Sequence, residues 1–131
     1  MIKFKHEDLY KEFLLNKVHS ELRMLAVVID NMVPVGITIT GVLGEKGIKR
    51  KSKSHEEGRA FDIRTRTWTE DAIFRRVRLI NKTFSTGLFH KDGSPMFVAV
   101  YHDSGYGLHL HIQIPKGRPL IIHTESGDIL I

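Results

Sequence analysis

The strictest constraint on the fold comes from residues 108–114, where aliphatic and polar side chains alternate without a break. Successive side chains of a β-strand point to opposite faces, so this pattern predicts a strand with one apolar and one polar face. The apolar face has Leu108, Leu110, Ile112 and Ile114. The polar face has His109, His111 and Gln113. Because same-face neighbours lie roughly 7 Å apart, one histidine could bind a metal ion while the other reaches a group bound to that ion.

A second segment supplies further metal ligands. Two alternate histidines are by themselves more often a solvated face or a hydrogen-bonded pair. However, His55 and Asp62 offer a nitrogen and an oxygen ligand, and the small residues Gly58 and Ala60 between them let the chain turn closely around an ion. With one histidine of the later strand they make three ligands and leave a fourth position open, which is the arrangement of catalytic zinc sites. The chain has no cysteine, so thiolate-bound zinc and disulfides are excluded.

The remaining patterns predict an α+β fold, in which a small antiparallel sheet carries the metal site and helices pack on it. Helical periodicity predicts one long helix over residues 7–31 and a second that follows a capping box at Thr67 and Glu70 and ends near 86–87. Alternation predicts strands at 35–40, 60–64, 96–101 and 129–131. The strand at 96–101 should form a hairpin with 108–114 around a turn at 104–107. The length of 131 residues predicts a single domain, 1–131.

Charge and hydropathy limit the partners. A formal charge of +5 gives a mild attraction for polyanions, which include nucleic acid and anionic cell-wall polymers. The basic stretch 46–53 has no interleaved aromatic residues and no recognised nucleic-acid motif, so we do not expect nucleic acid to be the partner. The longest apolar run is too short to span a bilayer, and the first residues lack the apolar core of a signal peptide. We therefore expect a monomer that is made in the cytoplasm and does not insert into membranes.

One resemblance to a known family covers roughly residues 37–114. His55, Gly58, Ala60 and Asp62 match, position by position, the motif Ser-x-His-x-x-Gly-x-Ala-x-Asp of the zinc peptidases of the hedgehog and D-alanyl-D-alanine peptidase fold. The later His-x-His resembles the second motif of phage-lysin-like members. The resemblance implies zinc bound by His55, Asp62 and His111, and cleavage of an amide bond in a peptide, most often one of bacterial cell-wall peptidoglycan.

The chain departs from this family at two positions. Lys53 replaces the serine of the first motif, although Ser52 and Ser54 flank it. Carboxypeptidase-type members place a glutamate three residues before the last histidine, where this chain has Leu108. His109 is similar in placement to the first histidine of the endopeptidase-type motif, so the resemblance favours an endopeptidase with His109 as catalytic base or transition-state stabiliser.

Other residues near the motifs receive weaker assignments. Arg59 and Arg64 are candidates to dock a substrate carboxylate, with solvated surface charge as the alternative for both. Glu56 and Glu57 are the nearest candidate carboxylate bases. His102 could orient a ligand proton, or could belong to a surface turn.

The main rival function is a non-catalytic module in which zinc only stabilises the fold, for example in a phage particle. Loss of the carboxypeptidase glutamate favours this alternative. Bound metal and an open fourth position fit both hypotheses, so only hydrolysis of peptidoglycan or peptides distinguishes them.

Overall fold

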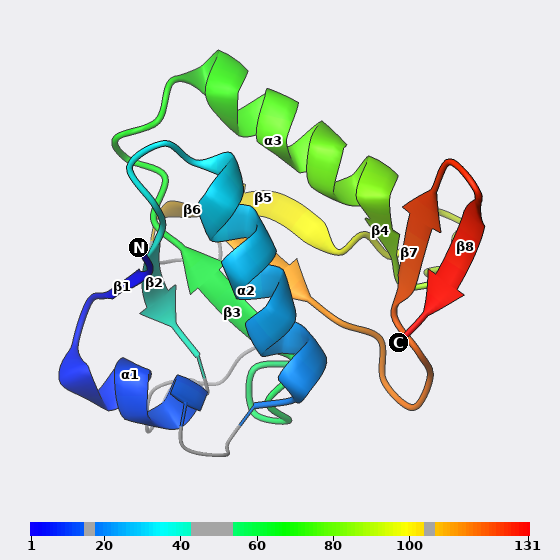
Figure 1. Ribbon diagram of the computed structural model, residues 1–131, viewed down its shortest axis with the longest axis horizontal. Coiled ribbons are helices and arrows are strands. Elements are labelled where there is room, and N and C mark those ends of the chain that lie inside the picture. Colours follow the sequence, from blue (N-terminus) through cyan, green and yellow to red (C-terminus); the bar gives the residue numbers. More distant parts are fainter. Residues whose placement is uncertain (15–17, 43–53, 104–106) are drawn as a thin grey trace.

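The computed structural model of the chain describes residues 1–14, 18–42, 54–103 and 107–131. Its helices are α1 (Glu7–Leu14), α2 (Ser20–Met32) and α3 (Glu70–Thr83). The larger sheet has the strand order β1-β2-β3-β6-β5, with bounds Lys3–Phe4, Thr38–Gly41, Ala60–Ile63, Leu108–Gln113 and Ala99–Asp103 in that order. A smaller sheet has the order β4-β7-β8, with bounds Phe84–Ser85, Ile121–Thr124 and Gly127–Leu130. This α+β arrangement confirms the predicted fold class (Figure 1).

The larger sheet is mixed, because one of its edge strands departs from the predicted antiparallel pairing. Strands β2, β3, β6 and β5 pair antiparallel, as predicted, but β1 pairs parallel to β2. The backbone N–H of Lys3 donates to the Ile37 carbonyl and that of Lys5 donates to the Ile39 carbonyl. A two-residue edge strand is too short to show any periodicity, so its sequence could not reveal it.

The apolar face of the larger sheet forms the core together with α2, which crosses in front of β3 in Figure 1. Phe61, Ile63, Leu110 and Ile112 are fully buried on the sheet, and Leu22, Leu25 and Ile29 are buried on the helix. Leu108 does not join them, because it is 58% exposed at the start of β6. Among the described residues, no helix is both long and apolar enough to cross a membrane.

The single helix predicted over residues 7–31 is wrong, because the structure has two helices there. His19 precedes α2 with an extended backbone, φ −66° and ψ 146°. Its N–H donates to the Gly58 carbonyl at 3.1 Å, a tertiary contact that replaces a helical hydrogen bond. Apolar residues keep helical spacing across the break, which explains why periodicity alone predicted continuity.

Helix α3 begins and ends at different residues than predicted. Its N-cap is Thr69, whose hydroxyl accepts a hydrogen bond from the Ala72 N–H at 3.2 Å, so the capping box predicted at Thr67 is wrong. The helix ends at Thr83 rather than near 86–87, because Phe84 has an extended backbone and enters β4. The Asn81 side chain bonds both backbone groups of Ala99 at 2.9 Å and so ties α3 to β5.

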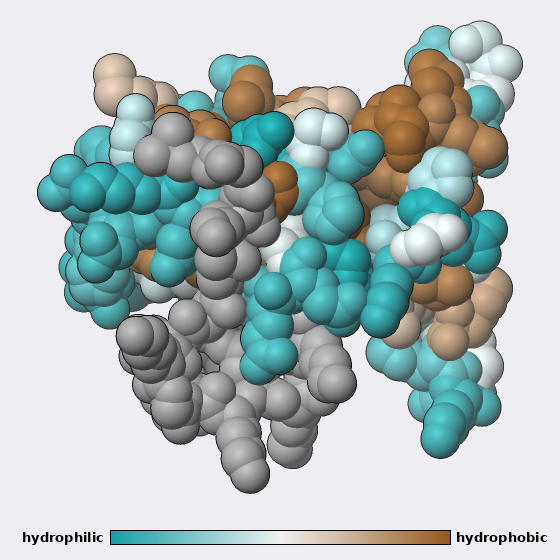
Figure 2. All heavy atoms as spheres, turned by 90° about the horizontal axis from the view of Figure 1, so that it is seen from below, coloured by the Kyte–Doolittle hydropathy of each residue, from teal (hydrophilic) through white to brown (hydrophobic). Residues whose placement is uncertain are grey.

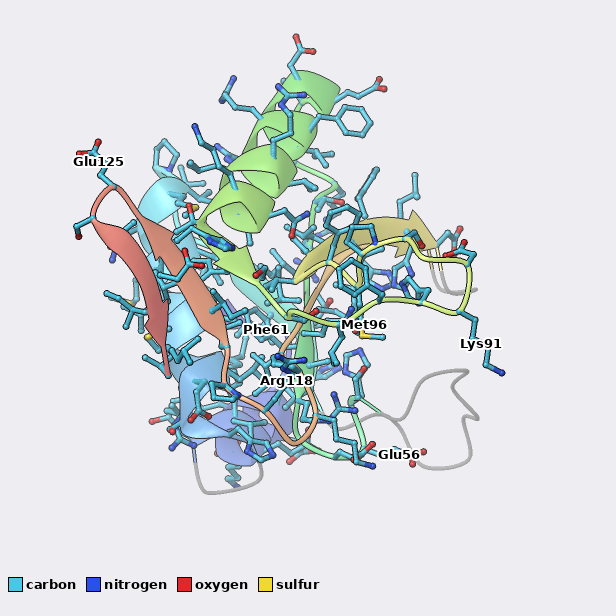
Figure 3. The ribbon with its side chains drawn as sticks, turned by 90° about the vertical axis from the view of Figure 1, so that its right-hand side faces the viewer. Glu56, Phe61, Lys91, Met96, Arg118 and Glu125 are labelled. Atoms are coloured by element: carbon cyan, nitrogen blue, oxygen red, sulfur yellow. The ribbon has the colours of Figure 1, made fainter. Side chains whose placement is uncertain are left out.

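In the C-terminal third of the chain, the strands begin and end at other residues than predicted. Strand β5 spans Ala99–Asp103 instead of 96–101, and most of the turn predicted at 104–107 lies outside the described residues. The short final strand was predicted at 129–131, and it is β8 of a hairpin whose first strand, β7, was not predicted. Glu125 marks the tip of this hairpin, which projects to one side of the molecule in Figure 3.

Candidate metal centre

The register of the larger sheet brings the predicted ligands together. Asp62 on β3 pairs with His111 on β6, and both side chains point to the face opposite the core. Gly41 on β2 lies beside Asp62, and Val100 on β5 lies beside His111. The site is therefore built across four strands, on the sheet face that α2 does not cover.

His55, Asp62 and His111 form a buried group that could hold a metal ion. His55 Nε2 and His111 Nδ1 are 3.2 Å apart, and they lie 3.2 and 3.1 Å from Asp62 Oδ1. The three residues are only 2%, 5% and 6% exposed. The predicted ligands thus converge on one small volume, although 49 residues separate Asp62 from His111 in the sequence.

The ring nitrogen of His55 that is directed away from the other two ligands, called the outer nitrogen below, is hydrogen-bonded to the main chain. His55 Nδ1 lies 2.6 Å from the Val42 carbonyl oxygen. A carbonyl can only accept, so Nδ1 carries the proton and Nε2 directs a lone pair into the site. His55 is therefore already in the tautomer that binds a metal ion through Nε2.

The tautomer of His111 is set by a side chain. Gln113 Nε2 donates to the Phe97 carbonyl at 2.8 Å, which turns the Gln113 amide oxygen toward His111 Nε2 at 3.2 Å. His111 Nε2 must then carry the proton, and Nδ1 directs its lone pair at Asp62. Such hydrogen bonds to the outer nitrogen are typical of metal-bound histidines.

With these tautomers, the atoms that face one another in the centre are two imidazole lone pairs and a carboxylate oxygen. Burial acts to raise the pKa of Asp62. A protonated His111 or His55 instead donates a hydrogen bond to this carboxylate and adds a positive charge beside it, and these effects outweigh burial and hold the pKa of Asp62 well below its ordinary value. An ionised carboxylate beside lone pairs is stable only with a cation among them. That cation can be a proton on a histidine or a metal ion, so the two compete for the same atoms.

Gly41 leaves room for the Asp62 carboxylate. A Cβ atom at position 41 would lie 2.9 Å from Asp62 Oδ2 and 3.6 Å from Asp62 Cβ, with the first distance shorter than real Cβ contacts. The sequence patterns did not single out this glycine as part of the site. Only the pairing of β2 with β3 reveals it.

His109, the predicted catalytic residue, lies at the edge of this group. Its Nδ1 donates to the Gly107 carbonyl at 2.9 Å, so Nε2 has the lone pair in the neutral ring. His109 Nε2 is buried and makes no hydrogen bond within the described residues, but it lies 3.5 Å from Asp62 Oδ1. His109 Nε2 therefore lies where it can exchange a proton with a molecule that enters the centre.

His102 belongs to the same site. It pairs with His109 across β5 and β6, and its ring lies 4.8 Å from that of His109 and 5.3 Å from that of His111. Burial, followed by the charges of His111 and His109, lowers the pKa of His102 below its ordinary value. The prediction that His102 supports the ligands fits this position better than the alternative of a surface turn.

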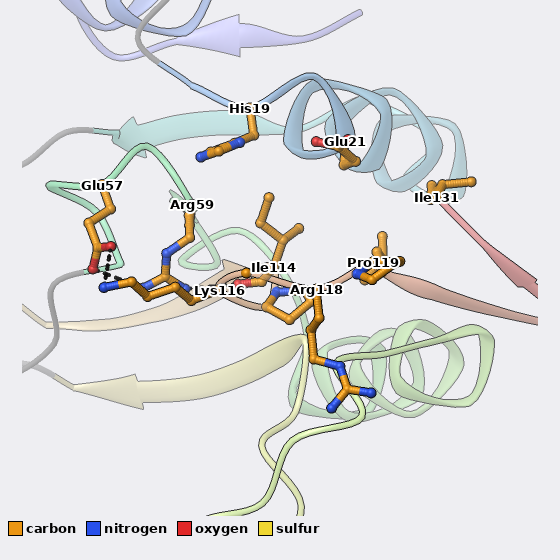
Figure 4. A pocket seen from close by; sticks show the side chains of 12 residues that line it. His19, Glu21, Glu57, Arg59, Ile114, Lys116, Arg118, Pro119 and Ile131 are labelled. Atoms are coloured by element: carbon orange, nitrogen blue, oxygen red, sulfur yellow. Dashed lines mark hydrogen bonds and ion pairs between the residues drawn. The ribbon is translucent and has the colours of Figure 1, made fainter.

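Arg59 is not in contact with the metal-ligating group. Its guanidinium donates to the Ile114 carbonyl at 3.1 Å and to Glu57 at 3.2 Å, and it lines a pocket beside the start of α2 (Figure 4). Glu57 also pairs with Lys116 at 3.1 Å. Hydrogen bonds from Lys116 and Arg59 lower the pKa of Glu57, which makes this carboxylate a poor proton acceptor.

Arg64 directly follows β3. Its N–H donates to the Thr38 carbonyl. The β3–β6 register, continued by one residue, places Arg64 opposite His109, and the hydrogen bond from the Thr65 hydroxyl to the Leu108 carbonyl agrees with this alignment. Of the two predicted arginines, Arg64 is the one at a register position next to the centre. The basic stretch 46–53, which includes Lys53, lies outside the described residues.

Comparison with known proteins adds no further assignment: no family model matches the chain, and no curated protein or solved structure matches it.

Proposed function

We propose that the centre binds zinc and that the protein hydrolyses amide bonds in peptidoglycan peptides, with an internal bond as the target. The observation that supports a metal-dependent function is the inward-facing set of two imidazole lone pairs and one carboxylate oxygen. All of the outer N–H groups of His55 and His111 are already bonded to oxygen atoms of the protein.

The donor spacing and chemistry fit zinc. Ligands at 2.0–2.1 Å around a tetrahedral zinc ion are about 3.3 Å from one another. The three donor atoms here are 3.1 to 3.2 Å apart, so His55, Asp62 and His111 would hold the ion with little rearrangement. Nitrogen and oxygen donors of this kind suit zinc, and three of them leave one position for a further ligand.

Bound zinc would polarise the substrate carbonyl and lower the pKa of a bound water molecule to about 7. His109 would accept the proton at Nε2, while its Nδ1–H stays bonded to the Gly107 carbonyl and maintains the ring orientation. The water oxygen would bond to the carbonyl carbon, the C–N bond would break, and protonated His109 would donate its proton to the leaving amine. Glu57, the nearest carboxylate in sequence, is paired with Arg59 and Lys116, and this supports His109 as the base.

The substrate class rests on the family resemblance and on charge. The formal charge of +5 favours approach to anionic cell-wall polymers. Arg64, at the register position opposite His109, is the residue we assign to a substrate carboxylate. Arg59 remains a weaker candidate, because Glu57 and the Ile114 carbonyl already bind its guanidinium.

The test is zinc analysis of the purified protein together with a peptidoglycan-release assay, with and without chelator. We expect zinc bound in a 1:1 ratio and soluble fragments that chelator abolishes and added zinc restores. Mass spectrometry of the fragments should show cleavage inside the stem peptide or cross-bridge. A His90→Ala variant is the matched control, because His90 is exposed and outside the site. Bound zinc with no product from any cell-wall peptide would instead favour the structural-zinc module.

A further inference from the structure

A second group of reactive side chains lies on the smaller sheet, on strands other than those that carry the metal ligands. Ser85 is on β4, His123 on β7 and Asp128 on β8. His123 Nδ1 is 2.8 Å from Asp128 Oδ1, and His123 Nε2 is 3.0 Å from Ser85 Oγ. The metal centre uses none of these residues.

The register explains why these side chains meet. His123 lies directly opposite Asp128 in the β7–β8 hairpin, so both point to the same face. Ser85 lies opposite Ile121, two residues before His123 on β7, and therefore points to that face as well. Three neighbouring strands thus present a carboxylate, an imidazole and a hydroxyl in one line.

The two hydrogen bonds have the directions that nucleophilic catalysis requires. A carboxylate only accepts, so His123 Nδ1 donates to Asp128, and His123 Nε2 is left with a lone pair that accepts the Ser85 hydroxyl proton. This is the arrangement of a nucleophile, a base and a group that orients the base, which is recognised by geometry and not by sequence order. We propose that Ser85 is a second, metal-independent nucleophile that takes acyl groups from esters.

The surroundings favour a substrate with an apolar acyl chain. Ile121 and Leu130 are opposite each other on β7 and β8 and share the face of Ser85, and Leu130 is 63% exposed. Figure 2 shows hydrophobic side chains gathered at the end of the molecule where Figure 1 has β7 and β8. The Arg118 guanidinium donates to the carbonyl of Gly87, two residues beyond Ser85, and this contact holds a positive charge at the end of β4. A small acyl ester can therefore lie on Ile121 and Leu130 with its carbonyl near Ser85.

The reaction balances with water as the only co-reactant. Ser85 Oγ attacks the ester carbonyl carbon and its proton passes to His123 Nε2. The ester C–O bond breaks, and the leaving alcohol takes that proton. Water then attacks the acylated serine, His123 accepts a proton from the water and returns it to Ser85 Oγ, and the carboxylic acid leaves.

The experiment is labelling with a fluorophosphonate probe, followed by peptide mass spectrometry, together with hydrolysis of p-nitrophenyl butyrate. We expect Ser85 to be labelled and Ser85→Ala to lose both signals. His123→Gln should slow labelling by about a hundredfold, the low end of what a general base contributes. Ser126→Ala is the matched control, since this hydroxyl is in the same hairpin but bonds Thr124. Chelator should leave both signals unchanged, because the metal centre takes no part.

Equal labelling rates at Ser85 in the parent and in His123→Gln would overturn the proposal, as would equal labelling of Ser85 and Ser126. Asp128→Asn provides a second variant, because it keeps the side-chain shape but removes the charge that orients His123. It should slow labelling several-fold. All variants are compared at matched thermal unfolding midpoints, so that a loss of labelling reports the reaction and not the fold.

Discussion

Gly41→Ala is the sharpest test of the metal centre, because Gly41 is far from every predicted ligand in the sequence but lies beside Asp62 in the structure. The substitution adds one methyl group to β2 opposite Asp62. The new Cβ would lie 2.9 Å from Asp62 Oδ2, whereas ordinary contacts begin at 3.4 Å. The carboxylate or the strand must therefore move by about 0.5 Å.

A displacement of this size matters at a metal site. Ligands have to stay within about 0.5 Å of their productive positions, and disturbed supporting contacts typically cost 10-fold to 100-fold in metal affinity. We therefore expect Gly41→Ala to weaken zinc binding by about that factor. Asp62 remains present, so binding should be weakened rather than abolished.

The assay is a competition titration against a chromophoric zinc chelator at pH 7.5. Gly93→Ala is the control, because Gly93 has a φ of 86° and no atom within 4 Å of the added Cβ. This control costs stability through backbone strain but leaves the centre untouched. Equal zinc affinities for Gly41→Ala and the parent would refute the placement of Asp62 against β2.

Asp62→Ala or His111→Ala should remove bound zinc, because three ligands leave little redundancy, and elemental analysis checks this. His109→Ala should keep the zinc but lower the hydrolysis rate by about a hundredfold, as measured by fragment release. Gln113→Ala should weaken zinc binding by about tenfold in the same competition titration, because His111 loses the acceptor for its outer N–H. In protein without metal, the pKa of His102 is lower in the folded than in the unfolded chain. As the pH falls, His102 therefore binds a proton in the unfolded chain before it does so in the folded protein. Stability should thus fall as pH drops below 6.5, and urea unfolding of His102→Phe should show a weaker dependence.

The strand that carries His109 and His111 could be predicted because alternation is a local property. Side chains two residues apart share a face whatever the strand pairs with, so the grouping of His109, His111 and Gln113 required no tertiary information. Leu108 was placed wrongly, because its exposure depends on where the neighbouring strands end.

Elements that depend on distant contacts were missed. The break between α1 and α2 rests on the hydrogen bond from His19 to the Gly58 carbonyl, which no helical period can indicate. Strand β1 exists because the first residues lie along β2, and β7 is short and half exposed. In such segments, pairing with another strand decides the structure more than intrinsic propensity does.

The ligand set could be predicted from spacing and the family resemblance, and His102 was already a candidate to support it, but other supporting groups could not be predicted. Gly41 and the Val42 carbonyl reach the centre through strand register and loop placement, which join segments far apart in sequence. Gln113 was placed on the correct face without a role. Its function became visible only when the Phe97 carbonyl defined the direction of its amide.

The hydrogen bonds to the outer nitrogens also determine how this centre can evolve. Main-chain carbonyls of Val42 and Gly107 fix the tautomers of His55 and His109, and no single substitution deletes a main-chain carbonyl. Of the three histidines whose tautomers the described residues define, His111 is the one that depends on a side chain, that of Gln113. Mutation at position 113 can therefore tune metal affinity in either direction while the ligands stay in place. A glutamate there would strengthen His111 as a donor, and an aliphatic residue would weaken it.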